Sequence, residues 1–203
     1  MRKSVLVAAA ATVAFAGPVA AQTEGGSSVT GAVNVTGSVT GICAVIPDGG
    51  SPTDSFTGTI SLGELNDSDG TLKDTLIGSS SASPAGTFTT RVVCTDNNPQ
   101  VTISATPLEE APDQITPAAG YADMIDYTAR VAINTASGGV VPFDTRTSDA
   151  VGGGGPLNDL IAAGPQDNVS VSVFDLDTVG GNTNILVVGQ YLGVISITIS
   201  PNT

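Results

Sequence analysis

Two pairs of aspartates carry the clearest potential for chemistry in this sequence. The chain contains two Asp-x-Asp pairs, Asp67 with Asp69 and Asp175 with Asp177. Two carboxylates at this spacing could share a proton or coordinate a calcium ion. Neither pair completes a calcium loop, because placing Gly70 at the sixth position of an EF-hand leaves a leucine at the twelfth. We therefore expect the first pair to cap its own turn, and we predict no metal site and no cofactor.

The remaining catalytic repertoire is small. The chain has no histidine, which removes the usual partner of serine and cysteine nucleophiles and the commonest general base near neutral pH. Lys73 is the single lysine beyond residue 21, so a Ser-Lys pair would depend on it. The run from Gly152 to Gly155 lacks the Gly-Lys-Ser/Thr ending of a phosphate loop and predicts a flexible loop. We predict that the protein is not an enzyme, and a hydrolase that uses Asp175 and Asp177 is the weakest hypothesis.

The first 21 residues have the three parts of a secretory signal. Arg2 and Lys3 precede an apolar run from Val5 to Phe15, and a stretch of small residues ends at Ala21. The apolar run is too short to span a bilayer. We therefore expect cleavage after Ala21, export of the protein and no membrane span.

The charge balance of the exported chain is strongly acidic. Cleavage would leave four basic residues against 19 carboxylates, a formal net charge of −15. Such a surface repels phosphate backbones. The full sequence has eight aromatic residues and no tryptophan, and these offer no stacking platform for single strands. We predict no nucleic-acid partner.

Apolar residues alternate with polar ones along most of the chain, and Gly, Pro, Asn or Asp separates the clusters, which is the signature of strands. We predict seven to nine strands after Val29. The best candidate for a helix is 156–163, and 79–86, 108–120 and 136–155 have the composition of surface loops. Strands at this spacing without intervening helices predict one all-β antiparallel sandwich. The residues expected to face inward are Phe56, Gly58, Ile60, Leu62, Phe88, Thr90, Val92, Val101, Ile103, Ala105, Tyr127, Ala129, Val131, Ile133, Val169, Val171 and Val173.

The two cysteines, Cys43 and Cys94, predict one disulfide, because an exported chain meets an oxidising compartment. The bridge would close a loop of about 52 residues and contribute roughly 4 kcal/mol in the chain-entropy model. The alternative is a pair of buried thiols.

The two ends of the exported chain have opposite patterns. The apolar face of the segment after the signal comprises Val29, Val33, Val35 and Val39. The apolar face of the last segment comprises Tyr191, Ile195, Ile197 and Ile199. A closing strand needs a backbone partner on each edge, and nothing follows it to provide one. We therefore expect a missing strand at one end and a spare strand at the other.

These segments together resemble the spore coat protein U type domain, which pilin subunits of the archaic chaperone-usher pathway use. The resemblance rests on the Val-Thr-Gly-x-Val-x-Val segment before Cys43, on Thr-Arg-Val-Val-Cys-Thr around Cys94, and on the closing Gly-x-Tyr-x-Gly-x-Ile-x-Ile-Thr-Ile strand. It implies an incomplete immunoglobulin-like antiparallel β-sandwich that lacks its last strand and is completed by a donor strand from a neighbouring subunit.

The resemblance also implies a domain plan and partners. Residues 1–21 would be the signal peptide, 22–40 the donor-strand extension and 41–203 the pilin-like domain. The four valines would be donor side chains, and the four apolar residues of the last segment would help line the acceptor groove. The partners would be other subunits of a homo- or heteropolymer, a periplasmic chaperone and an outer-membrane usher. The protein would cross the periplasm to the cell surface and serve there as a fimbrial subunit in adhesion or biofilm formation.

A second hypothesis comes from a different class of protein. The chain could be a self-contained secreted β-sandwich that binds carbohydrate or calcium through its acidic loops, with Val29 to Val39 as its own first strand. The glycine-rich residues 136–155 and the large negative charge depart from the pattern of the family. They leave open whether the subunit belongs to the shaft, to a minor position or to the tip.

Overall fold

The computed structural model describes residues 31–47, 49–111, 117–149 and 151–202. The chain divides into two units, residues 1–38 and 39–203. Of the first unit, residues 31–38 are described, and they are exposed and form neither helix nor strand. The second unit is built almost entirely of antiparallel strands packed as a sandwich, so the predicted all-β fold is confirmed.

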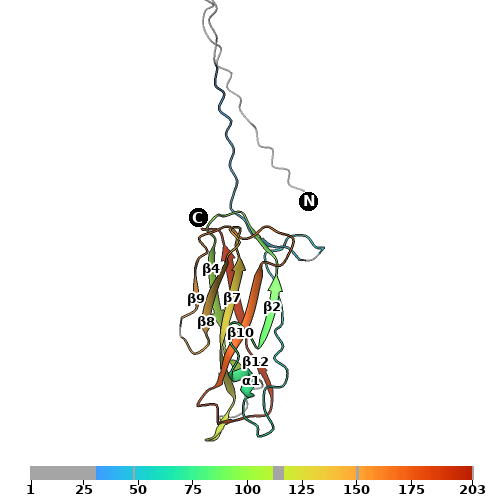
Figure 1. Cartoon of the computed structure of the whole chain (residues 1–203), viewed down its shortest axis with the longest axis vertical. Coiled ribbons are helices and arrows are strands. Elements are labelled where there is room, and N and C mark those ends of the chain that lie inside the picture. The colour runs from blue at the N-terminus through green and yellow to red at the C-terminus, as the bar shows by residue number, and fades with distance from the viewer. Residues whose placement is uncertain (1–30, 48, 112–116, 150, 203) are drawn as a thin grey trace, which may run out of the picture. The chain divides into compact units, whose positions relative to one another are not determined.

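Two long strands form the centre of the larger sheet. β7 (Met124–Asn134) and β10 (Val169–Thr178) pair antiparallel, with a register shift between Phe174 and Asp177. β2 (Gly86–Thr90) lies on the outer edge of β10, and β8 (Val140–Arg146) lies along the other edge of β7 (Figure 1). β5 (Leu108–Ala111) pairs with the same edge of β7 as β8, and β12 (Gln190–Leu192) pairs with β5.

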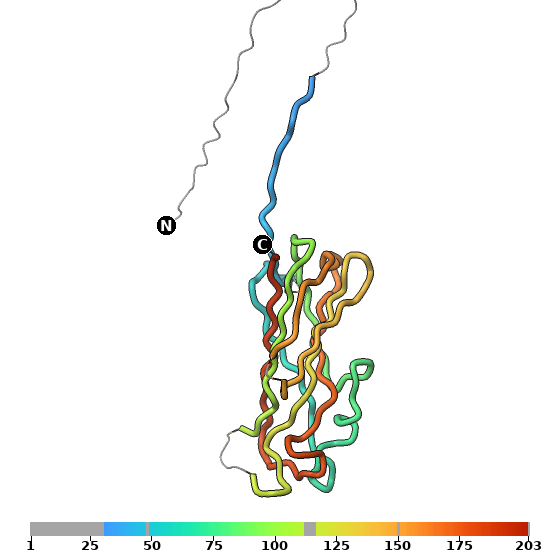
Figure 2. Tube along the Cα trace, turned by 90° about the vertical axis from the view of Figure 1, so that its left-hand side faces the viewer, coloured from blue at the N-terminus to red at the C-terminus, as the bar shows by residue number. Residues whose placement is uncertain are grey.

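The smaller sheet has the order β13-β4-β9. It comprises β4 (Gln100–Ala105), β9 (Gly153–Pro156) and β13 (Ile195–Ser200), and β13 runs beside β4 in the trace of Figure 2. Two further pairs are β1 (Cys43–Val45) with β3 (Val92–Cys94), and β6 (Tyr121–Ala122) with β11 (Ile185–Leu186). The helix found among the described residues is α1 (Asp74–Ile77), a single turn.

The core lies between the two sheets, where the period-two pattern of the sequence predicts it. The inward residues of β7 are 0 to 2% exposed, and those of β10 are 1 to 5% exposed. Val101 and Ile103 of β4 face them from the smaller sheet with exposures of 0% and 2%. Two strand faces that are apolar at every second residue can be buried only against each other, which favours a sandwich over a single sheet.

Three of the four residues in the run from Gly152 to Gly155 belong to a strand, which corrects the prediction of a flexible loop. Residues 153–156 pair with β4 as β9. A Cβ atom on Gly153 would overlap the carbonyl oxygen of Asp144 in β8, and one on Gly154 would overlap that of Val101 in β4. The absence of side chains therefore lets β9 lie against strands of both sheets, and it closes this side of the sandwich.

Two further predictions about this half of the chain are wrong. The helix expected at 156–163 does not form, because Asn158 has a φ of 58°, which a right-handed helix does not allow. Leu157 and Ile161 are core residues of an irregular segment instead. The loops expected at 108–120 and 136–155 contain β5 and β8, whose residues are mostly half-buried or, like Pro142, exposed, and so gave a weak strand signal.

The closing segment forms two strands instead of the single strand that was expected. β12 belongs to the larger sheet and β13 to the smaller one. The chain crosses between them at Gly193, where an added Cβ would lie 2.9 Å from the carbonyl oxygen of Pro107. The segment that pairs with this part of the chain crosses between β4 and β5 at the same level, where the N–H of Thr106 donates to the carbonyl oxygen of Val194 at 2.9 Å. The two paired segments therefore change sheet together.

The close approach of β9 can be tested with Gly153→Ala. We expect it to lower the free energy of unfolding by about 1 to 3 kcal/mol, because the new methyl group meets backbone atoms that cannot rotate away. Urea unfolding of the full chain measures the change. Gly164→Ala is the control, since a Cβ there meets nothing within 4 Å, and its effect should stay within about 0.5 kcal/mol. Equal unfolding midpoints for the two variants would contradict the packing of β9.

Candidate functional site

A groove of about 800 Å³ runs along the side of the sandwich opposite β9. One wall is β13, and the other is formed by residues 54–62, which we call the wall segment. The floor contains Phe88 of β2, Tyr127 of β7 and two valines of β10, and its end beside β1 is lined by Cys43, Val45 and Val92. The groove therefore opens directly onto the hydrophobic core.

The wall segment is held by its side chains and not by a ladder. Phe56, Ile60 and Leu62 are half-buried and pack against the core, so the predicted alternation is confirmed. Phe56 stacks on Phe88 with 6.0 Å between ring centroids. However, residues 56–62 form no strand, and within the described structure their backbone groups make no hydrogen bond. The N–H and C=O groups of residues 56–62 therefore have no protein partner among the described residues.

The opposite wall also has a free edge. β13 pairs with β4 along its whole length, from Ile195 to Ser200. It is the terminal strand of its sheet, and among the described strands none pairs with its other edge. The isoleucines of β13 are half-buried while Ser196 and Thr198 are exposed. The groove is therefore an apolar channel between two backbone edges.

The alternation of the closing segment puts four apolar residues on one face, and all four of them line this groove. They are Tyr191, Ile195, Ile197 and Ile199. Tyr191 is fixed at the β12 end, where its hydroxyl lies 2.9 Å from the carbonyl oxygen of Val187 and 3.1 Å from that of Ala122. Burial, with smaller contributions from Asp123 and Glu110, raises the pKa of Tyr191 to about 12.

The predicted disulfide is present. Cys43 and Cys94 are bonded and face each other across β1 and β3. Beside the bridge, the N–H of Ile42 donates to the Thr95 hydroxyl at 2.9 Å, and the N–H of Thr95 donates to the carbonyl of Ile42 at 2.9 Å. This end of the groove is therefore tied both covalently and by hydrogen bonds.

The valines of the N-terminal segment are exposed where they are described. Val33, Val35 and Val39 are 89%, 92% and 87% exposed, and residues 31–41 form no strand. Val29 lies outside the described residues. Apolar side chains at this level of exposure have no contacts to stabilise them, so their burial elsewhere would be favourable.

The two Asp-x-Asp pairs have different surroundings. Asp69 accepts hydrogen bonds from the N–H and the hydroxyl of Thr71, which lowers its pKa and makes it a turn residue, as predicted. Asp175 and Asp177 both form ion pairs with Arg146, each at 2.7 Å. No group of three or more potential metal ligands occurs in the part of the chain that is described.

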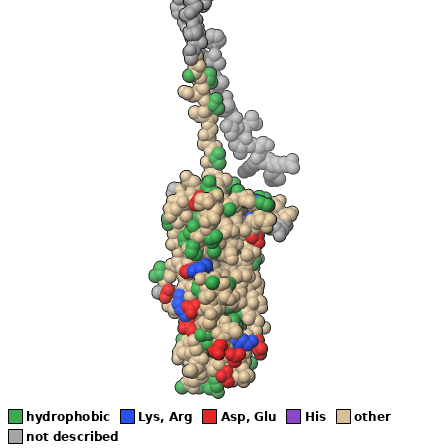
Figure 3. Space-filling model, viewed as in Figure 1, with side chains coloured by type: hydrophobic (Ala, Val, Ile, Leu, Met, Phe, Trp, Pro, Cys, Tyr) green, Lys and Arg blue, Asp and Glu red, His purple; other side chains and the backbone are tan. Residues whose placement is uncertain are grey.

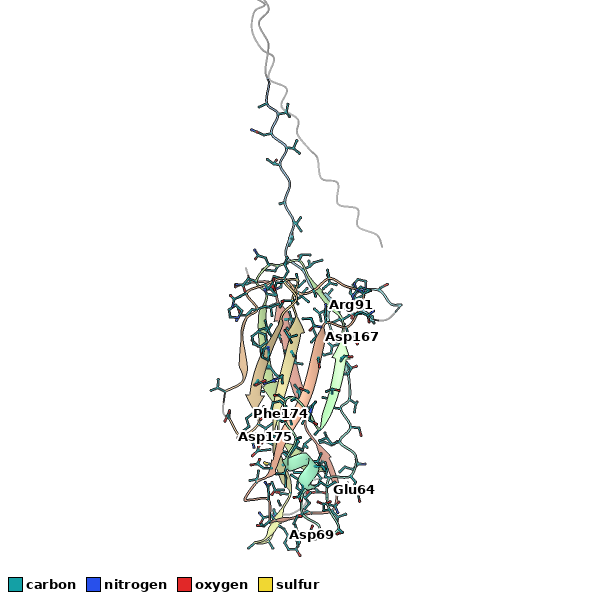
Figure 4. The ribbon with its side chains drawn as sticks, in the orientation of Figure 1. Glu64, Asp69, Arg91, Asp167, Phe174 and Asp175 are labelled. Carbon is teal, nitrogen blue, oxygen red and sulfur yellow. A yellow bond between two sulfur atoms is a disulfide. The ribbon has the colours of Figure 1, made fainter. Side chains whose placement is uncertain are left out.

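Sequence reasoning missed the cluster around Arg146, because its members come from different strands. Asp175 sits at the register shift of β10 with a φ of 55°, and Arg146 of β8 also donates to its carbonyl oxygen at 3.1 Å. Nearby, Arg130 pairs with Asp144 and lies 5.3 Å from the ring of Phe174. The space-filling view shows basic and acidic side chains next to each other on this face (Figure 3), and the stick view labels Phe174 and Asp175 at neighbouring positions (Figure 4). The cations of this face are thus neutralised within the domain.

The lining of the groove limits what it can do chemically. Among the described residues that line it, Asp54 supplies the single carboxylate, and the other ionisable groups are the hydroxyls of Tyr127 and Tyr191. An apolar channel with free backbone groups on both sides has the properties of a binding site for an extended strand.

Comparison with known proteins found no matching family model, no similar curated protein and no similar solved structure. Among the described residues, no helix is long and apolar enough to cross a membrane.

The contribution of the disulfide can be tested with the double variant Cys43→Ala and Cys94→Ala. Loss of a bridge between residues 51 positions apart should lower the free energy of unfolding by roughly 4 kcal/mol in the chain-entropy model. Urea unfolding with and without reductant measures it. Reductant should destabilise the wild type and leave the double variant unchanged. A wild type that is insensitive to complete reduction would contradict a stabilising role for the bridge.

Proposed function

We propose that this protein is a structural subunit of a surface fimbria that polymerises by donor-strand exchange. In this proposal the groove of one subunit binds the N-terminal segment of a neighbour and so acquires the strand that completes its sandwich. One observation carries the proposal: the groove combines an apolar floor with a free backbone edge on each side. A small apolar ligand would need the floor alone, whereas a strand uses all three surfaces.

The backbone edges support a strand as the occupant. An inserted strand would form one ladder with β13 and a second with the wall segment, and would satisfy groups that have no protein partner in the described structure. Its inward side chains would cover Ile195, Ile197 and Ile199, which are only half-buried. The occupant therefore stabilises the domain as well as joining the subunits.

The composition of the N-terminal segment supports it as the donor. Residues 25–42 contain no charged side chain, so their insertion removes no charge from water. Burial of the four valines would contribute on the order of 6 to 12 kcal/mol before the cost of ordering the segment. The exposure of Val33 and Val35 is consistent with a segment that needs a partner.

The proposal includes export and assembly partners. The signal-like first 21 residues support passage to the cell exterior. A free edge beside an apolar channel is an aggregation hazard for a subunit before assembly. A periplasmic chaperone that covers the groove and an outer-membrane usher that exchanges it for a donor strand would remove this hazard.

The donor role predicts a difference between the two faces of the N-terminal segment. Val33→Asp with Val35→Asp should abolish polymerisation, because two carboxylates would enter the apolar groove. Asn34→Asp with Thr36→Asp adds the same charge to the outward face and should leave polymers largely intact. Ladders of exported protein on unheated gels measure both.

Two results would contradict the proposal. One is persistence of ladders after deletion of residues 22–40. The other is a wild-type chain that stays monomeric and melts at a higher temperature when calcium is added, which would favour the self-contained binding module.

The acceptor role predicts a change in amide exchange. The amides of residues 56–62 should exchange with solvent quickly in the monomer, since no ladder protects them, and slowly in the polymer. Hydrogen exchange with mass-spectrometric readout on both forms measures this, with the amides of β7 as the control that is slow in both. Fast exchange of residues 56–62 in a stable polymer would place the donor strand elsewhere.

A further inference from the structure

Tyr127 is a polar residue in the floor of the groove whose hydroxyl lacks a partner. The residue is 2% exposed and lines the groove. Its backbone N–H donates to the hydroxyl of Thr147 at 2.9 Å, and its carbonyl accepts from the N–H of Thr147 at 3.0 Å. Its own hydroxyl makes no hydrogen bond to any part of the chain that is described, and burial raises the pKa of Tyr127 to about 12.

The second tyrosine of the groove is different. The hydroxyl of Tyr191 has two carbonyl oxygens within hydrogen-bond distance, which is the usual condition of a buried tyrosine. Since Tyr127 lines the groove, an inserted strand would cover it and remove the remaining access of its hydroxyl to water. Its partner must then come from the occupant.

The N-terminal segment has a position suited to this hydroxyl. Its inward face reads Val29, Gly31, Val33, Val35, Gly37 and Val39. The pattern is the same in both directions, so a glycine is second from each end whichever way the strand runs. Val171 pairs with Val131 and Val173 with Ala129, whereas Val92 lies beside Asn168, so Tyr127 lies beyond both valines, towards the end of the groove floor away from Val92. A glycine lets a neighbouring group approach the backbone closely, and a carbonyl oxygen in a ladder keeps a second lone pair.

We infer that Tyr127 is a specificity-determining residue of the groove and selects a strand from a second copy of this chain that places a glycine, Gly31 or Gly37, over its ring. The phenol hydroxyl donates a hydrogen bond to a backbone carbonyl oxygen of the strand beside that glycine. A valine at the same position would cover the hydroxyl with methyl groups and leave it without a partner. This inference rests on the proposed function and adds the register of the strand and the chemistry that sets it.

The test uses the full exported chain, refolded at low concentration with an excess of synthetic peptide of residues 22–40. The chain has no tryptophan, and two of its three tyrosines line the groove, so tyrosine emission reports binding. Tyr127→Phe should bind the wild-type peptide about three- to tenfold more weakly, the effect of one hydrogen bond. Tyr191→Phe is the control in the chain: it should lower the stability of the peptide-free protein, whereas Tyr127→Phe should not.

Variant peptides identify the glycine. The substitutions Gly31→Ala and Gly37→Ala are each tested on the wild type and on Tyr127→Phe, with Ala32→Val on the outward face as the control. One glycine substitution should weaken binding to the wild type at least threefold more than binding to Tyr127→Phe. The other should weaken both equally.

The outcomes separate the two proposals. Unchanged affinity of Tyr127→Phe for the wild-type peptide, or additive effects for both glycines, would overturn the inference and leave the proposed function standing. Failure of the wild-type peptide to bind the wild-type chain would overturn both.

Discussion

A sandwich of two sheets must close both of its sides, because each terminal strand has a row of backbone groups that need partners. Here the two sides meet this constraint differently. On one side β9 pairs with β4 and also touches β8, which is possible because its residues lack the Cβ atoms that would collide with neighbouring carbonyls. On the other side β13 and the wall segment face each other across a groove of about 800 Å³. The groove is therefore the one side of the described domain that its own strands do not close, and the proposed function follows from that difference.

Much of the fold could be predicted from the sequence, because burial on one face leaves a period-two signal. The inward residues of β7 and β10 illustrate this, and so do the four groove-lining residues from Tyr191 to Ile199. Predictions failed where a long-range contact decides the local structure. The glycine run resembles a flexible loop until β4 and β8 are known to lie on both sides of it, and the crossing at Gly193 depends on the distant Pro107.

The candidate site was also predictable only in part. Its apolar walls and the disulfide could be predicted from residue types and spacing. The cluster of Arg146 with Asp175 and Asp177 was not, because an arginine 29 and 31 residues away gives no local signal. The role of Tyr127 was not predictable either. The alternation of its strand marks Tyr127 as a core residue, but only the three-dimensional structure shows that its hydroxyl has no partner among the described residues. The formal charge of −15 expected of the exported chain also conceals that Arg130, Arg146 and Lys73 are each paired within the domain.

The position of the disulfide has a mechanical consequence for a fibre. If subunits are joined through residues 22–40, a pulling force enters each domain just before Cys43, at the start of a strand of only three residues. Such a strand, loaded from its end, would detach from β3 one hydrogen bond at a time. The Cys43–Cys94 bond lies at the first residue pair of that ladder, so it transfers the load covalently into β3 before any hydrogen bond between β1 and β3 is stretched. A fibre of such subunits would then carry tension through a disulfide bond at the point where the chain enters each domain. Its weakest element would be the non-covalent binding of the donor strand in each groove.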